Sequence, residues 1–183
     1  KKDWPRIALC GLFGVAMNQL LFFAGLNITT PINAAIIMTS NPILVLIAAS
    51  IILHEVITKQ KILGLSLGVI GALLIIIFKA DFSFDSTTWP GDVMILMNAA
   101  SYGVYLVIVK PLMTKYQPLT IIKWVFTFGV LYVIPFGFYD FMAIEWSSFT
   151  TTIWLETAFV VICTTFFAYL LNIFALKKLQ PST

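Results

Sequence analysis

The feature that most constrains this chain is a long stretch, residues 7–53, without a single Asp, Glu, Lys or Arg. About 20 apolar residues of α-helix cross the ~30 Å hydrocarbon core of a bilayer, because each residue adds 1.5 Å. The stretch is therefore too long for one crossing, and it divides at the polar turn Asn27-Ile28-Thr29-Thr30-Pro31. Four more uncharged runs follow at 62–78, 93–109, 124–139 and 157–176. The sequence predicts six transmembrane helices at 6–26, 32–53, 59–78, 91–110, 119–139 and 155–177.

Composition places the chain in a membrane and argues against nucleic acid as a partner. Apolar residues make up 60% of the chain and charged residues 10%, against about 25% charged residues in soluble domains. The mean hydropathy is +0.99. The few basic residues form short clusters rather than a basic patch with stacking aromatics. Cys10 and Cys163 lie in apolar runs, which favours small buried side chains over a disulfide or a metal pair.

The topology follows from counting Lys and Arg in successive connections. The counts are 3, 0, 2, 1, 3, 0 and 2 from the N-terminal segment to the C-terminal one. This alternation fits six crossings. By the positive-inside rule it predicts a cytoplasmic N-terminal end for this segment. We expect an integral membrane protein.

Polar residues inside the predicted spans recur at helical spacing, so that each stripe occupies one helix face. Six of them are predicted to line a substrate cavity: Asn18, Asn41, Tyr102, Tyr105, Tyr169 and Asn172. Polar groups inside a membrane are costly and mark functional paths. The alternative is that they only join helices through hydrogen bonds worth ~0.6 kcal/mol each.

The middle of the second span contains Asn41-Pro42. Proline removes a backbone hydrogen bond to the carbonyl four residues back, so Pro42 predicts a helix kink. Interrupted helices at mid-membrane recur in transporters. Glu55, at the cytoplasmic end of this span, is a candidate for the mouth of the cavity, with Lys59 as an ion-pair partner if the helix continues. In the third span, the spacing of Gly64, Gly68 and Gly71 predicts close helix packing.

Catalysis finds little support in the sequence. His54-Glu55 would suit a zinc-protease helix only with a second histidine four residues on, where the chain has Thr58. His54 is the only histidine. We therefore expect no metal site, no cofactor and no enzyme activity.

The block LNITTPINAAIIMTSNPILVLIAASIILHEVITKQKILGLSLGVIGALLI resembles the EamA-type repeat of the drug/metabolite transporter superfamily. The shared pattern comprises the mid-span proline, the terminal glutamate and the glycine-spaced helix. Two later stretches resemble the first and third helices of a second repeat: GDVMILMNAASYGVYLVIVK and FFAYLLNIFALKKLQPST. The second of these stretches also resembles the first span of this chain. In that comparison Tyr169 corresponds to Asn18, and Phe174-Ala175 corresponds to Phe23-Ala24.

The resemblance implies an all-α integral membrane fold whose six helices are part of a ten-helix bundle built from two inverted five-helix repeats. On that plan the chain lacks the first two and the last two helices. Residues 1–78 hold the last three helices of the first repeat, 79–90 the outer connection, and 91–183 the first three helices of the second.

The implied function is secondary transport by alternating access in a bacterial inner (plasma) membrane, exporting small metabolites or amphipathic compounds. The implied partners are the lipid bilayer and a small-molecule substrate. The alternative is a non-transporting helical membrane scaffold or small-molecule sensor. The substrate, the coupling ion and the oligomeric state stay open at this point.

Overall fold

The computed structural model describes residues 2–79 and 87–178, apart from the side chains of 72, 73, 75–79, 177 and 178. All secondary structure in these ranges is helical. Most of the predicted outer connection, 79–90, lies outside the described residues.

The first three predicted spans form six helical segments: α1 (Trp4–Gly11), η1 (Leu12–Ala16), α2 (Met17–Leu26), α3 (Pro31–Met38), α4 (Asn41–Leu53) and α5 (Lys59–Lys79). The first span is continuous through a π-helical segment, η1. The second is divided into α3 and α4.

The last three spans follow as α6 (Trp89–Met113), α7 (Pro118–Ala143), the short 3₁₀ turn η2 (Trp146–Ser148), α8 (Thr151–Phe159), the π-helical η3 (Val160–Phe167) and α9 (Ala168–Lys178). Five helices among the described residues are long and apolar enough to cross a membrane. The sixth predicted span is α5, a helix of 21 residues. The predicted all-α membrane fold is confirmed.

Local capping interactions and backbone conformation mark where the second span begins and ends. The Thr30 side chain accepts a hydrogen bond from the Asn33 N–H at 3.1 Å, and Pro31 occupies the first helical position. The helix ends at Leu53 because His54 adopts a left-handed conformation, with φ 54°.

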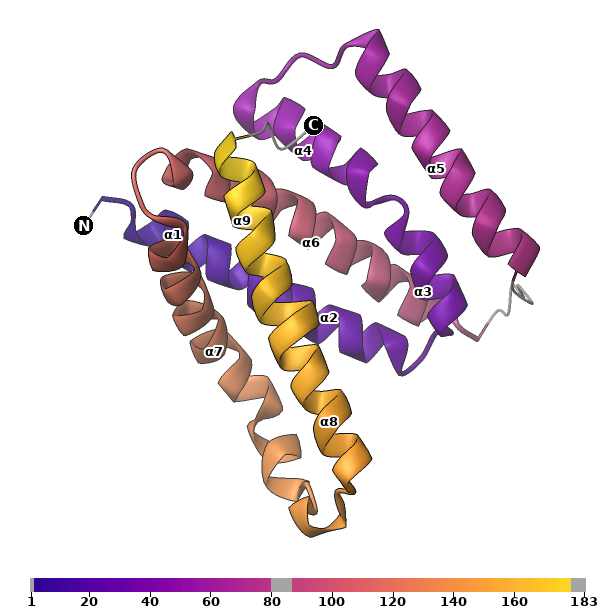
Figure 1. Ribbon diagram of the computed structural model, residues 1–183, viewed down its shortest axis with the longest axis vertical. Coiled ribbons are helices and arrows are strands. Elements are labelled where there is room, and N and C mark those ends of the chain that lie inside the picture. Colours follow the sequence, from indigo (N-terminus) through magenta and orange to yellow (C-terminus); the bar gives the residue numbers. More distant parts are fainter. Residues whose placement is uncertain (1, 80–86, 179–183) are drawn as a thin grey trace.

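Helix α6 lies at the centre of the bundle, with α2 and α4 making its most extensive contacts (Figure 1). Helices α1 and α7 pack together, and α9 contacts both α6 and α7. Helix α5 lies at one edge of the molecule, on the far side of α3 and α4 from α6 (Figure 1). The main core gathers between α1, α6, α7 and α9 around the fully buried side chains of Tyr105, Val109, Leu112, Val125 and Ile173.

Glycines allow the closest helix crossing. A Cβ at Gly25 would lie 2.9 Å from the carbonyl oxygen of Gly91, and one at Gly91 would lie 2.7 Å from that of Gly25. By contrast, a Cβ added at Gly64, Gly68 or Gly71 of α5 would have nothing within 4 Å. The close packing predicted for these three glycines is therefore wrong for the described part of the chain. The face of α5 that carries Gly64 and Gly68 is open, and it lines a groove.

Candidate functional site

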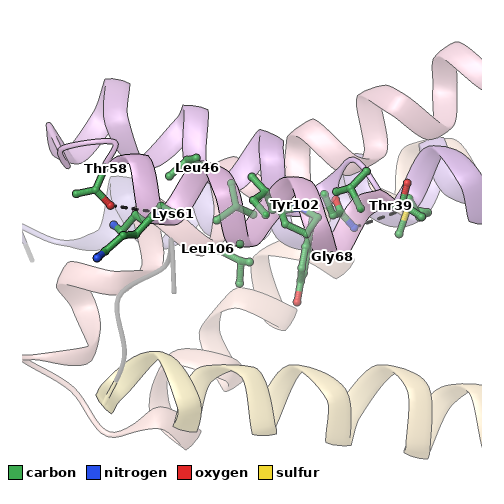
Figure 2. Close-up of a pocket in the computed structure, with 15 residues that line it drawn as sticks. Thr39, Leu46, Thr58, Lys61, Gly68, Tyr102 and Leu106 are labelled. Atoms are coloured by element: carbon green, nitrogen blue, oxygen red, sulfur yellow. Dashed lines mark hydrogen bonds between the residues drawn. The ribbon is translucent and has the colours of Figure 1, made fainter. Parts of the chain in front are cut away.

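The main cavity is a groove of about 930 Å³ between α4, α5 and α6, called here the α4/α5 groove. Figure 2 shows Thr58 and Lys61 at one end of it, Leu46 and Leu106 along it, and Tyr102, Gly68 and Thr39 toward the other end. The remaining lining residues are Met38, Asn41, Pro42, Val45, Gln60, Gly64, Leu65 and Val69.

The interruption of the second span lies on the wall of this groove. Helix α3 ends at Met38, and α4 begins at Asn41. Pro42 has no N–H to donate to the Met38 carbonyl, so the regular helix cannot continue through it. The hydroxyls of Thr39 and Ser40 donate at 2.6 Å to the carbonyls of Ile36 and Ile37 in the preceding turn. The same two carbonyls also accept hydrogen bonds from the backbone N–H groups of Thr39 and Ser40, at 3.1 Å and 2.9 Å, so each hydroxyl adds a second hydrogen bond where the helix stops.

Asn41 supplies an acceptor at the groove wall. Its Nδ2 makes a weak contact at 3.9 Å with the Met38 sulfur. Its Oδ1 is buried and has no hydrogen-bond partner among the described residues. A buried acceptor without a partner costs about 1–3 kcal/mol. A donor group of a ligand, or a water, in the groove would relieve this cost.

Tyr102 connects the groove to the aromatic residues behind it. Its hydroxyl accepts a hydrogen bond from Asn172 Nδ2 at 2.8 Å. Its ring centroid lies 5.7 Å from that of Tyr105 and 6.1 Å from that of Tyr169. The Tyr102 hydroxyl keeps its own proton to donate, so it is a second polar group that a ligand can use.

A buried polar cluster lies behind Tyr102, where polar stripes of the first, fourth and sixth spans meet. Asn98 Nδ2 donates to the Asn18 carbonyl at 2.5 Å, and Ser101 Oγ donates to the Phe13 carbonyl at 2.6 Å. The Tyr169 hydroxyl donates to the Gly14 carbonyl and lies 3.2 Å from Asn18 Oδ1. Two of these carbonyls, Phe13 and Gly14, belong to η1, where π-helical geometry disturbs the regular backbone ladder.

The structure divides the six predicted cavity residues. Asn41 and Tyr102 line the α4/α5 groove, and Asn172 reaches it through Tyr102. Asn18 and Tyr169 belong to the buried polar cluster, where they join helices. Tyr105 is 0% exposed and packs in the core, with its hydroxyl lacking a partner among the described residues. Tyr105 is not among the residues that line the described groove.

Glu55 forms an ion pair with Lys61, whose Nζ lies 3.4 Å from Glu55 Oε2. The sequence suggested Lys59 instead, on the condition that the helix continued. It stops at Leu53, so the spacing of four residues no longer brings Glu55 and Lys59 together. Because Lys61 lines the groove, the pair places Glu55 beside one of its ends.

The sequence reasoning missed Thr39, Thr58, Gln60 and Lys61 as groove residues. The last three follow Glu55 closely in a short polar segment, and that proximity was the available signal. Thr39 differs, since only the position of the helix break directs it to the groove. Within the described ranges, no group of three or more His, Cys, Asp or Glu could hold a metal ion.

The sequence model of the EamA-like transporter family matches residues 1–77 and 89–183. The chain belongs to this family. The match covers well over half of the chain, and the helical membrane fold agrees with it.

Individual relatives are transporters by name. An "Uncharacterized transporter YyaM" of Bacillus subtilis is 29% identical over 93% of this chain and 56% of its own length. A "Probable terminal-alkyne amino-acid exporter" of Streptantibioticus cattleyicolor is 26% identical over 73% of this chain and 44% of its own length. The chain thus spans about half the length of the curated relatives that it matches.

A solved structure titled "Crystal structure of protein" has the same fold. It superposes with a TM-score of 0.73 at 18% identity, covering 97% of this chain and 59% of the other.

Proposed function

We propose that this chain is part of a secondary transporter that exports small metabolites or amphipathic compounds by alternating access. On this proposal it lies in a bacterial inner membrane, with its N-terminal end in the cytoplasm. Residues 1–78 and 91–183 belong to two inverted repeats, and the division of the family match into 1–77 and 89–183 supports this arrangement.

The observation that carries the proposal is the α4/α5 groove at the interrupted helix. A helix that stops inside a membrane is tolerated where it lines a cavity. Here the wall of the cavity offers two uncharged groups, the Asn41 acceptor and the Tyr102 hydroxyl, and the charged Lys61 that also lines it is paired with Glu55. A neutral or zwitterionic substrate with a hydrogen-bond donor suits such a wall.

The test is transport by the full-length protein in everted membrane vesicles, with labelled phenylalanine, labelled threonine and ethidium as probes. We expect at least one probe to accumulate above the level in vesicles without the protein. Replacing Asn41 by Ala should lower the initial rate by about three- to tenfold, since a lost hydrogen bond costs about 0.5–1.5 kcal/mol.

The matched control is Asn27→Ala, which makes the same chemical change at an exposed position in the turn after α2. This variant should transport at the wild-type rate and reach the membrane in equal amounts. Equal rates for Asn41→Ala, Asn27→Ala and the wild type would remove Asn41 from the site. No accumulation of any probe would count against export.

The rival function, a non-transporting scaffold or sensor, is favoured by the buried polar cluster, whose hydrogen bonds join helices and need no ligand. Cysteine labelling at two neighbouring positions of α6 separates the two functions. Ser101 is buried against the Phe13 carbonyl, whereas Tyr102 lines the groove. A transporter predicts that a membrane-impermeant thiol reagent modifies Tyr102→Cys but spares Ser101→Cys. Protection of both would indicate the closed, dry bundle of the rival.

A further inference from the structure

A second cavity, of about 530 Å³, lies between α3, α5 and the start of α6, and is called here the α3/α6 groove. Its lining is mainly aliphatic: Ile36, Ile37, Thr39, Ser40, Ile43, Val69, Trp89, Asp92, Val93 and Leu96. Two residues, Thr39 and Val69, line this groove and the α4/α5 groove as well. The two grooves therefore meet between the break in the second span and the middle of α5.

The two grooves extend toward opposite ends of the bundle. The α4/α5 groove includes Lys61, in the first turn of α5, and the α3/α6 groove includes Trp89, at the start of α6. Helix α5 has 21 residues, a rise of about 31 Å, which is the thickness of a bilayer core. The start of α6, which follows the end of α5 along the chain, is thus across the membrane from Lys61. The lining of the two grooves therefore extends from Lys61, near the start of α5, through Val69 to Trp89, at the start of α6.

The lining residues differ in polarity on the two sides of the point where the grooves meet. The Thr39 hydroxyl donates to the Ile36 carbonyl at 2.6 Å, so its proton is already used within α3. Val69, the other residue shared by the two grooves, contributes an aliphatic side chain from α5. On one side are Asn41, Tyr102, Gln60 and Lys61, and on the other Ile36, Ile37, Val93 and Leu96. The α4/α5 groove is therefore the more polar of the two; in the more apolar α3/α6 groove, the Asp92 carboxylate accepts hydrogen bonds from Thr29 and Thr88.

We propose that Thr39 and Val69 form the constriction of a substrate path that runs along the open face of α5 and joins the two grooves. The molecule that takes this path is small and amphipathic, with its polar part held beside Asn41 and Tyr102 and its apolar part in the α3/α6 groove. This inference rests on the proposed transport function, and it assigns that function a route and a size-selecting position.

The experiment uses the full-length protein with every native cysteine replaced, including Cys10 and Cys163, and with Leu65→Cys as a reporter in the α4/α5 groove. A cationic, membrane-impermeant methanethiosulfonate reagent is the probe, applied to each face of the membrane in right-side-out and everted vesicles. Adding Val69→Phe should slow labelling from the Trp89 side by about tenfold or more, because a hydrophobic constriction blocks a hydrated ion. Labelling from the Lys61 side should stay nearly unchanged.

Ile70→Phe is the matched control. Ile70 neighbours Val69 on α5 but is 54% exposed and lies outside both grooves. It should leave the labelling rate from both sides unchanged. Val69→Ala is a second test in case Val69→Phe does not fold. Its smaller side chain should speed labelling from the Trp89 side.

Equal labelling rates from the Trp89 side in the Val69→Phe, Ile70→Phe and parent proteins would overturn the proposed path. So would protection of Leu65→Cys from both sides, which would mean that other helices of the whole protein cover the grooves. If the path fails while Asn41→Ala still slows transport, the proposed function survives without it. If, in addition, no probe is transported and Asn41→Ala therefore has no measurable effect, the proposed transport function itself fails.

Discussion

Tyr105 Oη and Asn41 Oδ1 are both buried without a hydrogen-bond partner among the described residues, but their surroundings differ. Tyr105 Oη is enclosed by the core, next to the rings of Tyr102 and Tyr169, whereas Asn41 Oδ1 lies at the wall of a groove. The cost of desolvation is paid in both places. Only at Asn41 can a molecule in the groove supply the missing hydrogen bond and so offset this cost. Asn41 is therefore the better candidate for substrate contact.

Outside the membrane-spanning segments, Asp3 joins the N-terminal segment to the connection between α6 and α7. Lys115 Nζ lies 2.9 Å and 3.2 Å from its two carboxylate oxygens, and the Tyr116 hydroxyl donates to it at 3.0 Å. The hydrogen bond from Lys115, followed by that from Tyr116, lowers the pKa of Asp3 below its ordinary value of 3.8. The bond to Asp3 raises the pKa of Tyr116 above 10.0.

These shifts set the pH range in which the contact stabilises the fold. The depressed pKa of Asp3 means that its contribution is full above pH 3.8 and is lost as the pH falls through the lowered value. The raised pKa of Tyr116 means that its contribution is full below pH 10.0 and is lost as the pH rises through the raised value.

We therefore expect Asp3→Asn to lower the melting temperature by a constant small amount between these limits, and the difference from wild type to vanish in stronger acid. Thermal unfolding in detergent over a pH series measures it. Asp140→Asn removes one exposed carboxylate at the far end of α7 and is the control for charge alone. A difference that persists unchanged in strong acid would contradict the ion pair as its cause.

At the scale of helices, the charge-free runs predicted the six long helical spans because a bilayer leaves a chain few alternatives to a helix of fixed length. Pro42 likewise predicted a disturbance in the second span, and the helix stops at Thr39–Ser40, just before it. The π-helical segments η1 and η3 had no such signal. In η1, two backbone carbonyls accept hydrogen bonds from other helices: Phe13 from Ser101 and Gly14 from Tyr169.

The glycines show the same limit, since a glycine on a helix face can meet a neighbouring helix or none. A Cβ at Gly14 would overlap the ring of Tyr105, whereas one at Gly64 would meet nothing within 4 Å. Gly14→Ala should destabilise the protein by about 1–3 kcal/mol through overpacking. Gly64→Ala should be neutral or stabilise it by up to about 1 kcal/mol, because alanine favours the helix.

Thermal or denaturant unfolding of the two variants in the same detergent measures this contrast, and each serves as the control for the other. Equal shifts in both would show that the difference between the packed face of the first span and the open face of α5 has no effect on stability.

At the scale of the whole molecule, the sequence predicted that polar stripes face one another but not how they share the interior. Part of the fourth-span stripe bonds to backbone carbonyls of the first span, as at Asn98 and Ser101, while the Tyr105 hydroxyl is left without a partner among the described residues. Asn41 and Tyr102 remain for the groove. Spacing along one helix cannot reveal this division, because it depends on which neighbour each face meets.

The contact of Asn18 Oδ1 with the Tyr169 hydroxyl, at 3.2 Å, joins two positions that correspond to each other in the proposed inverted repeats. A half-turn rotation exchanges corresponding points, and exchanged points are neighbours only when they lie beside the rotation axis. This pair therefore marks where the axis of the proposed repeats passes. In the proposed mechanism, the inward-open and outward-open states differ by an exchange of conformation between the two repeats. This exchange swaps the positions of Asn18 and Tyr169 and leaves them neighbours. We therefore expect their hydrogen bond to be the same in both states.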